Sequence, residues 1–400
     1  MALPAKATHQ QTRAHNQGLV LRALYDRGPV SRAEIARITG LTRTTVSDLV
    51  AEFIAGGLVK EVGRGPSSGG KAPILVEVDG DARHVIGLDL GERAFTGAIV
   101  NLHGSIRRTA TQAVAGRDGD EALAALYRLL DDLVGSERGI LLGIGVGTPG
   151  IVNPESGTIL WAVNLDWQDL PLGRLLREQY GVPTYVANDS RAAALAESLF
   201  SAERRGTNLV AIKVGNGIGA GLVFNGELFH GDAFGAGEIG HLGLVDDGER
   251  CRCGRFGCLE TVASSRAILA RATEAGRDDP KSFLGRRLRA SGELTLDDIR
   301  AGLEAGDETT RRIVVAAGRF LGQAVAGLIG ALNVNQIVLL GAVASLGEPW
   351  LDAVRDEAKR RSLALTSAGT TLELGRTEHD VVLGASALLM TRELGLAPVR

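Results

Sequence analysis

Hydrophobic and polar positions in the first 80 residues follow a helical period first and a strand period afterwards. Apolar residues recur every three to four positions between residues 12 and 27, which predicts a helix that Pro29 ends. Ser31 begins a second helix, with Glu34 at the capping-box position and Ile38 on the predicted buried face. Two helices of this kind, joined by a tight turn, are typical of a DNA-binding head.

A third helix is expected from Thr42 to the Gly56-Gly57 pair. Two strands follow at residues 58–62 and 74–78, and a loop rich in glycine, serine and basic residues joins them. Three helices and a β-hairpin in this order predict a winged helix-turn-helix domain over residues 1–80.

From residue 81 to residue 400, short buried strands alternate with helical stretches, which predicts an α/β domain. A strand that ends in a glycine turn occurs near Asp89 and again near Gly215, and this repetition suggests two related lobes. Strands are expected at 85–91, 97–100, 141–146, 184–187, 209–214 and 336–340, and helices at 118–133, 191–200 and 308–332.

Length and charge fit a two-part cytosolic protein. The chain has 400 residues, more than one ordinary core holds. The first 80 residues carry ten Lys/Arg and seven Asp/Glu, a net charge of +3, so the rest carries −6 of the total of −3. A slightly basic head on an acidic body fits a DNA-binding module. No run approaches the roughly 20 apolar residues of a membrane span, and residues 1–17 lack a signal-peptide core. We expect a cytoplasmic protein with no membrane partner.

The third predicted helix has the chemistry of a recognition helix. Arginine can pair with guanine in the major groove, and hydroxyl groups can reach bases or phosphates. Basic residues in the glycine-rich hairpin can approach the sugar–phosphate chain. The alternative is a small helical docking domain. The predicted DNA-binding residues are Thr42, Arg43, Thr44, Thr45 and Ser47 in the helix, with Arg64 and Lys71 in the hairpin.

The three cysteines of the chain, Cys251, Cys253 and Cys258, lie within eight residues. An odd, clustered set in a cytosolic chain is a poor disulfide framework and a good metal site. With His241 they supply one nitrogen and three sulfur donors, a set that structural zinc favours in a closed tetrahedron. The alternative is three free thiols beside an unrelated histidine, but free cysteines are usually buried singly. The sequence therefore predicts a structural zinc ion.

Two segments carry a family resemblance: Glu238 to His241 (EIGH) and Cys251 to Glu260 (CRCGRFGCLE). They resemble the signature of the ROK family, named for repressors, open reading frames and kinases. The likeness extends from about residue 85 to residue 394, and repressor members also carry a winged helix-turn-helix in front. The resemblance implies a two-lobed actin-like, ribonuclease H-like sugar-kinase fold. One lobe would take roughly residues 81–188 with the C-terminal helix, and the other residues 189–380.

The resemblance also implies a sugar site beside the zinc. Carboxylates can accept paired hydrogen bonds from sugar hydroxyls, and one helical turn would place Glu238 and His241 on the same side. His241 can hold zinc through one ring nitrogen and contact the sugar with the other. The alternative for each carboxylate is a solvated surface charge. The residues implied for the sugar are Asn164, Asn188, Asp189, Glu238, His241 and Glu260.

The nucleotide-binding half departs from the kinases of that family. Their first phosphate loop reads Asp-x-Gly-Gly-Thr-Lys, whereas residues 89–94 read DLGERA, and the carboxylate of Glu92 would repel a triphosphate. Their second loop reads Gly-Thr-Gly, and here it is Gly215-Asn216-Gly217. A later Gly-Gly pair is Gly341-Ala342. These departures argue against efficient phosphoryl transfer and predict that the protein is not an enzyme, while residual kinase activity stays open. Asp189, the catalytic-base position of the kinases, is expected to serve for hydrogen bonding only.

We therefore expect a sugar-responsive transcription regulator, a repressor of carbohydrate genes. It would be a homodimer or homotetramer that binds double-stranded operator DNA and a sugar or sugar phosphate. One alternative is an ATP-dependent sugar kinase with an added DNA-binding head, and another is a repressor whose body is only a dimerisation scaffold. The identity of the sugar, the sign of its effect and the operator sequence stay open.

Overall fold

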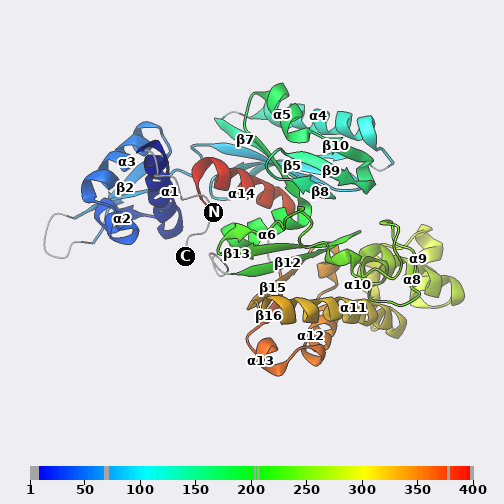
Figure 1. The fold of residues 1–400 in the computed structure, drawn as a ribbon. Coiled ribbons are helices and arrows are strands. Elements are labelled where there is room, and N and C mark those ends of the chain that lie inside the picture. The colour runs from blue at the N-terminus through cyan, green and yellow to red at the C-terminus, as the bar shows by residue number, and fades with distance from the viewer. Residues whose placement is uncertain are drawn as a thin grey trace.

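The computed structural model describes residues 9–66, 72–114, 116–137, 139–201, 204, 208–375 and 379–396. A small head lies beside a larger body made of two stacked lobes (Figure 1). The last described residues, which follow α14, lie where the head meets the body. The body therefore holds the head by the chain connection and also by the C-terminal segment.

The head has three helices and a three-stranded sheet of order β1-β3-β2, so the predicted winged helix-turn-helix is confirmed. Strands β2 and β3 form the wing, and their register shifts between Glu61 and Gly63. The elements are α1 (His9–Arg27), β1 (Val30–Ser31), α2 (Arg32–Thr39), α3 (Arg43–Ala55), β2 (Val59–Arg64) and β3 (Ile74–Val78).

Helix α2 differs in two details from the sequence prediction. Ser31 Oγ accepts from the Glu34 backbone N–H at 3.2 Å, but the Glu34 carboxylate pairs with Arg37, so the capping box is only half formed. Ile38 was expected in the core, and this is wrong, since its side chain is 39% exposed. At 100° per residue, Ile38 lies roughly 110° from the centre of the face that Ile35 and Ala36 bury.

The first lobe is built on a five-stranded sheet of order β11-β7-β4-β5-β6. Helix α4 packs on β5 and β6, and a small three-stranded sheet follows β7 along the chain. The elements are β4 (His84–Leu90), β5 (Ala94–Asn101), β6 (Ile106–Ala113), α4 (Gly119–Ser136), β7 (Leu141–Thr148), β8 (Ile151–Asn153), β9 (Thr158–Ala162), η1 (Val163–Leu165), β10 (Trp167–Leu170), α5 (Leu172–Tyr180) and β11 (Thr184–Asn188).

The second lobe repeats this topology. Its sheet has the order β14-β13-β12-β15-β16, with an antiparallel β12–β13 pair and parallel β12–β15 and β15–β16 pairs. In the first lobe, β4 pairs antiparallel with β5 and parallel with β7, and β7 pairs parallel with β11. The two lobes predicted from the repeated strand-turn pattern are thus related in topology.

Helices of the second lobe surround its sheet and carry the connections to the cleft. The strands are β12 (Leu209–Val214), β13 (Ile218–Phe224), β14 (Glu227–Leu228), β15 (Gln336–Leu340) and β16 (Thr371–Leu374). The helices are η2 (Ile239–His241), α7 (Glu260–Ala263), α8 (Ser265–Asp278), α9 (Phe283–Ser291), α10 (Leu296–Glu304), α11 (Glu308–Leu332), η3 (Ala342–Leu346), α12 (Glu348–Arg361) and α13 (Ala364–Ser367).

Two buried helices, α6 (Asp189–Phe200) and α14 (Asp380–Leu394), lie between the two sheets (Figure 1). They pack against each other, α14 on β4 and β7 of the first lobe and α6 on β12 and β13 of the second. A Cβ at Gly384 would lie 1.6 Å from the Ala192 carbonyl oxygen, so only glycine allows this approach. The two helices therefore form a close-packed layer that links the lobes.

Helix α11 corrects one expectation from the sequence. Among the described residues, it is the one helix with the length and hydropathy of a membrane span, contrary to the prediction that no such segment exists. Half of its apolar window is buried, against α12 and the other helices of the second lobe. A core helix of a globular domain has this same pattern.

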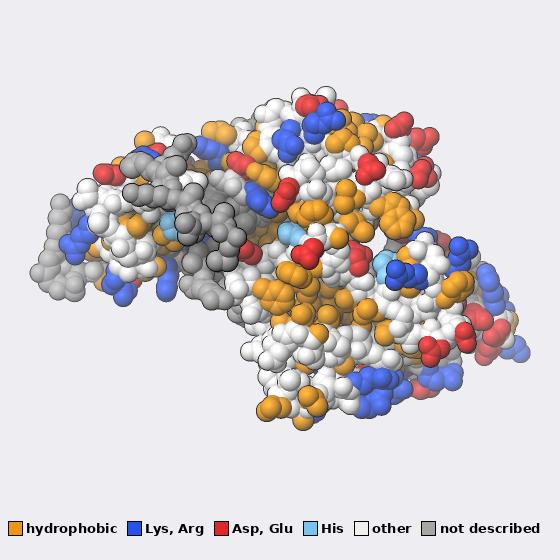
Figure 2. Space-filling model, in the orientation of Figure 1, with side chains coloured by type: hydrophobic (Ala, Val, Ile, Leu, Met, Phe, Trp, Pro, Cys, Tyr) orange, Lys and Arg blue, Asp and Glu red, His pale blue; other side chains and the backbone are white. Residues whose placement is uncertain are grey.

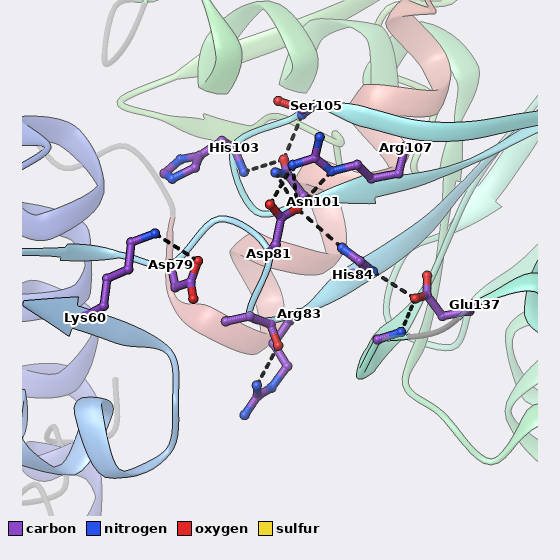
Figure 3. A network of polar contacts seen from close by, with 12 residues as sticks. Lys60, Asp79, Asp81, Arg83, His84, Asn101, His103, Ser105, Arg107 and Glu137 are labelled. Carbon is purple, nitrogen blue, oxygen red and sulfur yellow. Dashed lines mark hydrogen bonds and ion pairs between the residues drawn. The ribbon is translucent and has the colours of Figure 1, made fainter. Parts of the chain in front are cut away.

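Polar contacts fix the junction between head and body (Figure 3). Arg83 donates to the Gly56 carbonyl in the head at 2.9 Å, and Lys60 pairs with Asp79 at 3.3 Å. Hydrogen bonds from Arg107 and Asn101 lower the pKa of the Asp81 carboxyl to about 2. The linker between the two parts is therefore tied to both of them.

The far end of α14 also holds the head. The Arg22 guanidinium of α1, 5% exposed, donates to the Leu396 carbonyl oxygen and to Asp26 Oδ2, the latter at 2.6 Å. Gly18 and Gly395 lie in backbone contact, and the core of the head is continuous with apolar residues of α14 such as Leu388. The head is consequently packed on the body.

Candidate functional site

The exposed start of α3 carries the predicted DNA-binding side chains. Thr42 caps the helix by accepting from the Thr45 backbone N–H at 3.2 Å. Thr42, Arg43, Thr44 and Ser47 are exposed. Thr45 is half-buried, and its hydroxyl lies 2.9 Å from that of Thr42, so it belongs to the cap more than to the free surface.

In the wing, Arg64 is exposed at the end of β2. Lys71, the other predicted wing residue, lies outside the described residues. Arg64 and Arg43 form no ion pair with the described part of the chain, so both guanidinium groups are available to phosphate or base atoms.

The predicted zinc ligands come together. One donor atom from each of His241, Cys251, Cys253 and Cys258 lies within 4.8 Å of the others. Cys251 Sγ is 3.7 Å from His241 Nδ1, and Cys253 Sγ is 3.7 Å from Cys258 Sγ. A zinc–sulfur bond of about 2.3 Å in a tetrahedron separates two sulfur atoms by about 3.8 Å, so the spacing of the Cys253 and Cys258 sulfur atoms matches that of two zinc ligands.

Short backbone contacts shape the loop that carries these ligands. Cys251 N–H donates to the Arg255 carbonyl at 2.7 Å, and Gly257 approaches Val245 so closely that a Cβ would lie 1.9 Å from its carbonyl oxygen. Burial raises the pKa of the Cys258 thiol to about 12, so the thiolate form requires a neighbouring cation. One histidine and three cysteines in this arrangement could therefore hold a metal ion.

Helix α6 begins with the Asn188-Asp189 pair, at the line where the two lobes meet. Asn188 Oδ1 accepts from the backbone N–H groups of Ser190 and Arg191, and its amide donates to the Gly150 carbonyl at 3.0 Å. One amide hydrogen of Asn188 therefore remains for a ligand. The side chain of Asp189 is 20% exposed.

Glu238 precedes the short helix η2 and His241 is its last residue, and Glu238 has electrostatic contact with His241, Asp189 and Glu260. Burial raises the pKa of the Glu238 carboxyl above its usual value. Because His241 Nδ1 faces the cysteines, Nε2 is the ring nitrogen left for another partner. The predicted carboxylates and the histidine thus form one cluster.

Glu260 begins α7 directly after the cysteine loop. Its Oε2 accepts from the Ile218 backbone N–H at 3.2 Å, and its Oε1 accepts from Arg266 at 3.2 Å. A Cβ at Gly217 would lie 2.9 Å from Glu260 Oε2, which accounts for glycine there. The carboxylate is therefore fixed between the cysteine loop and the turn after β12.

The sequence reasoning missed Arg252, which links the lobes across the cleft mouth. Arg252 Nη1 donates to Asn164 Oδ1 at 2.9 Å and to Glu92 Oε1 at 3.1 Å. Glu92 Oε2 also accepts from Asn216 at 2.6 Å. Asn164, a predicted sugar residue, already has a protein partner in this network. The sequence did contain one signal for Arg252, which is that a charged residue lies between two cysteines.

Lys213 was also not predicted from the sequence. A single lysine in a buried strand belongs to no recognised motif, so no pattern marked it as a site residue. Its ammonium lies 2.7 Å from Asp189 Oδ2. Burial lowers the pKa of Lys213, and the carboxylates of Asp189, Asp89 and Asp380 outweigh this effect and raise it above its usual value. Figure 2 shows acidic and histidine side chains along the line between the two lobes.

The chain combines a winged helix-turn-helix head with a two-lobed body that contains a cluster of three cysteines and one histidine. This combination defines its class: multidomain proteins with a winged head on a sugar-kinase-like body. The chain belongs to the ROK family, whose model matches residues 85–392. The model of the MarR family matches residues 12–67. The winged head and the sugar-kinase-like body predicted from the sequence are confirmed by these matches.

Individual proteins resemble the chain over nearly its whole length. It is 32% identical over 393 residues to a xylose repressor of Caldicellulosiruptor bescii, covering 96% of this chain and 97% of that protein. The crystal structure of a ROK family transcriptional regulator, a homologue of the Escherichia coli MLC protein, matches with a TM-score of 0.83 and 27% identity, covering 96% of this chain and 98% of that one.

A kinase shares the body alone. The structure of a ROK family glucokinase from Streptomyces griseus, in complex with glucose and AMPPNP, matches with a TM-score of 0.68 and 25% identity. It covers 76% of this chain and 98% of the kinase. The head is therefore the part that this chain has and the kinase lacks.

Proposed function

We propose that this protein is a sugar-responsive transcriptional repressor that binds operator DNA through its head and a sugar in the cleft of its body. One observation carries the proposal. The chain joins a winged head to a body with an intact cluster of carboxylates of the kind that bind sugar hydroxyls, Asp189, Glu238 and Glu260. The likeness to a xylose repressor over 96% of the chain supports it.

In this proposal zinc is structural and lies on His241, Cys251, Cys253 and Cys258. The ion would fix the cysteine loop and so place Glu260 and His241 beside the sugar. Sugar hydroxyls would donate to the carboxylates of Asp189, Glu238 and Glu260 and contact Asn188, Asn164 and His241 Nε2.

We propose that side chains of the protein occupy the region that corresponds to the nucleotide site of the kinases. Two of the residues that depart from the kinase pattern contact each other, since Glu92 accepts from Asn216 at 2.6 Å. Asn216 is held in turn by Ser265 at 2.9 Å. A carboxylate and an amide in this place take up hydrogen bonds that phosphate oxygens would need, and the carboxylate repels them.

On the DNA, Arg43 and the hydroxyls of Thr42, Thr44 and Ser47 would enter the major groove, and Arg64 would contact phosphate. A homodimer or homotetramer would bring two heads to successive grooves about 34–36 Å apart, so a small rotation of the heads changes affinity. Sugar binding in the cleft would alter the spacing of the heads by moving the lobes.

The test is a titration of labelled operator DNA with purified protein, with and without D-xylose, D-glucose and N-acetyl-D-glucosamine. We expect one of these sugars to change DNA affinity and to raise the melting temperature of the protein. Glu260→Gln should lose both effects, whereas the matched change Glu304→Gln, exposed on α10, should keep them. A response to no sugar contradicts the sensor function.

A second candidate, an ATP-dependent sugar kinase with an added head, is favoured by the intact Asp189 and by the likeness to a glucokinase bound to glucose and AMPPNP. A coupled assay of ATP consumption with the same sugars separates the two. Turnover at about 1–100 per second, the usual range for kinases, identifies an enzyme. We expect no turnover above the rate without sugar.

A further inference from the structure

Lys213 of β12 is the centre of a charge cluster to which three other elements contribute. Its side chain is 21% exposed, and its ammonium lies 2.7 Å from Asp189 Oδ2 at the start of α6. Asp89 at the end of β4 and Asp380 at the start of α14 are the other carboxylates that act on it. One cation from the second lobe thus faces carboxylates from the first lobe and from both central helices.

The geometry of Asp189 depends on this lysine. Asp189 Oδ1 accepts from the backbone N–H of Ser190 at 2.7 Å and lies 3.3 Å from the Ser190 hydroxyl. Lys213 holds the second oxygen. Contacts at both oxygens fix the plane of the carboxylate. Each carboxylate oxygen has more than one lone pair, so the oriented group can still accept a hydrogen bond from a sugar hydroxyl.

Burial acts against ionisation in the rest of the cluster. It raises the pKa of Asp89 to about 6 and raises that of Asp380, and Lys213 opposes the shift in both. Asp189 raises both values further, His379 lowers that of Asp89, and Glu197 of α6 raises that of Asp380. Without the lysine, neighbouring carboxylates would share protons near neutral pH.

We propose that Lys213 is a positioning residue of the sugar site, whose ammonium orients the Asp189 carboxylate and keeps it available as an acceptor for a sugar hydroxyl. This inference rests on the proposed function, because Asp189 contacts a sugar only if the cleft binds one. It assigns to Lys213 a role that the sequence pattern did not reveal.

The test compares the unchanged protein with Lys213→Met, Lys213→Arg and Lys359→Met, an exposed lysine of α12 that serves as the matched control. Binding of D-xylose, D-glucose and N-acetyl-D-glucosamine is measured by calorimetry between pH 7 and pH 9. Zinc content and circular dichroism verify the fold of each variant. Lys213→Gln is the second variant if the methionine protein does not fold.

We expect Lys213→Met to bind the sugar about tenfold more weakly at pH 7, because the Asp189 carboxylate loses the charge-assisted hydrogen bond that orients it. Its affinity should rise toward pH 9 as the cluster loses its shared proton. The unchanged protein should be flat over this range, because the pKa of Asp89 at about 6 lies below it. Lys213→Arg should return to within about threefold, since it keeps the charge.

Equal affinity of Lys213→Met and the unchanged protein would overturn the inference. A loss that is the same at every pH and is not rescued by arginine would also overturn it, because that is the behaviour of a packing defect. If the unchanged protein binds none of the three sugars, the proposed function itself fails. Binding by the unchanged protein together with an unaffected methionine variant removes only the role of Lys213.

Discussion

At the residue scale, the cleft contains a carboxyl group whose ionisation opposes folding. Burial raises the pKa of Asp89 from 3.8 to about 6. An acid whose pKa is raised in the folded protein is stable in its protonated form, so stability falls as pH rises from about 4 to about 6. The difference of about two units corresponds to up to about 3 kcal/mol above pH 6.

Asp89→Asn should therefore stabilise the protein at pH 7.5 by up to about 3 kcal/mol and change little at pH 4. Asparagine keeps the shape and removes the charge. Urea unfolding of both proteins at the two pH values measures the difference. As a control, Asp297→Asn, exposed on α10, should show no such pH dependence. A gain that is equal at both pH values would mean that charge is not its cause.

The sequence predicted which residue types form the site, and it did not predict what holds them. Three cysteines within eight residues can hardly serve anything but a metal, so their convergence with His241 followed from spacing. Lys213 and Arg252 act through contacts with residues 24 to 160 positions away, such as Asp189 and Glu92. Such pairs depend on how the lobes pack, which local periodicity does not encode.

At the element scale, the cysteine loop is expected to depend on a bound ion for its shape. Cys253→Ala should remove the zinc, and the melting temperature of the protein should fall. Without the ion, the folded loop would hold its remaining thiol groups unfavourably close together. Metal analysis and thermal unfolding with and without a chelator measure this. Arg252→Ala changes the neighbouring residue, which is not a ligand, and should keep one ion per chain. Zinc retained by Cys253→Ala would contradict the ligand set.

Helix α3 and the wing should contribute to DNA binding in different ways. Arg43→Ala should cost about 1–3 kcal/mol on the operator and relax specificity, whereas Arg64→Ala should weaken all DNA and reduce the salt slope by about one. Fluorescence anisotropy on operator and scrambled DNA at several salt concentrations separates the two. Arg311→Ala in α11 of the second lobe is the control. An unchanged operator preference in Arg43→Ala would exclude it from base contact.

Helices and strands were predicted correctly where the hydrophobic pattern was long. They were missed where packing against other elements, and not the local pattern, determines the secondary structure. The predicted helix at 308–332 coincides with α11 (Glu308–Leu332), because its apolar period runs for seven turns. Strand β6 (Ile106–Ala113) was not predicted, since its residues are mostly polar and it pairs only at the edge of the sheet. Helix α14 was foreseen only as a C-terminal helix, because it is apolar on every side.

At the scale of the whole molecule, one helix spans the distance from the cleft to the head. Helix α14 begins at Asp380, near Lys213, and Leu396, which follows the helix, accepts a hydrogen bond from Arg22 of α1 in the head (Figure 1). Fifteen helical residues extend about 22 Å. Because the ten residues from Val381 to Met390 are buried in a close-packed layer, we expect a shift at one end of the helix to move the other end with it.

The clamp at the head end of α14 gives this arrangement a direct test. Arg22→Met keeps the apolar stem and removes the bonds to the Leu396 carbonyl and to Asp26. We expect about 2 kcal/mol lower stability. Sugar affinity should stay within about twofold, while the sugar-induced change in DNA affinity should shrink several-fold, because binding and coupling are separate free energies.

Calorimetry with the sugar and anisotropy with operator DNA measure the two quantities on the same preparation. Arg27→Met, on the exposed end of the same helix, is the matched control and should behave as the unchanged protein. If Arg22→Met keeps the full sugar-induced change in DNA affinity, the sugar site and the head are connected through the other contacts of the junction. Those are the pair of rings Tyr25 and His103, 5.9 Å apart, and the bond from Arg83 to Gly56. Loss of sugar binding in the same variant would instead mean that the head helps to shape the cleft.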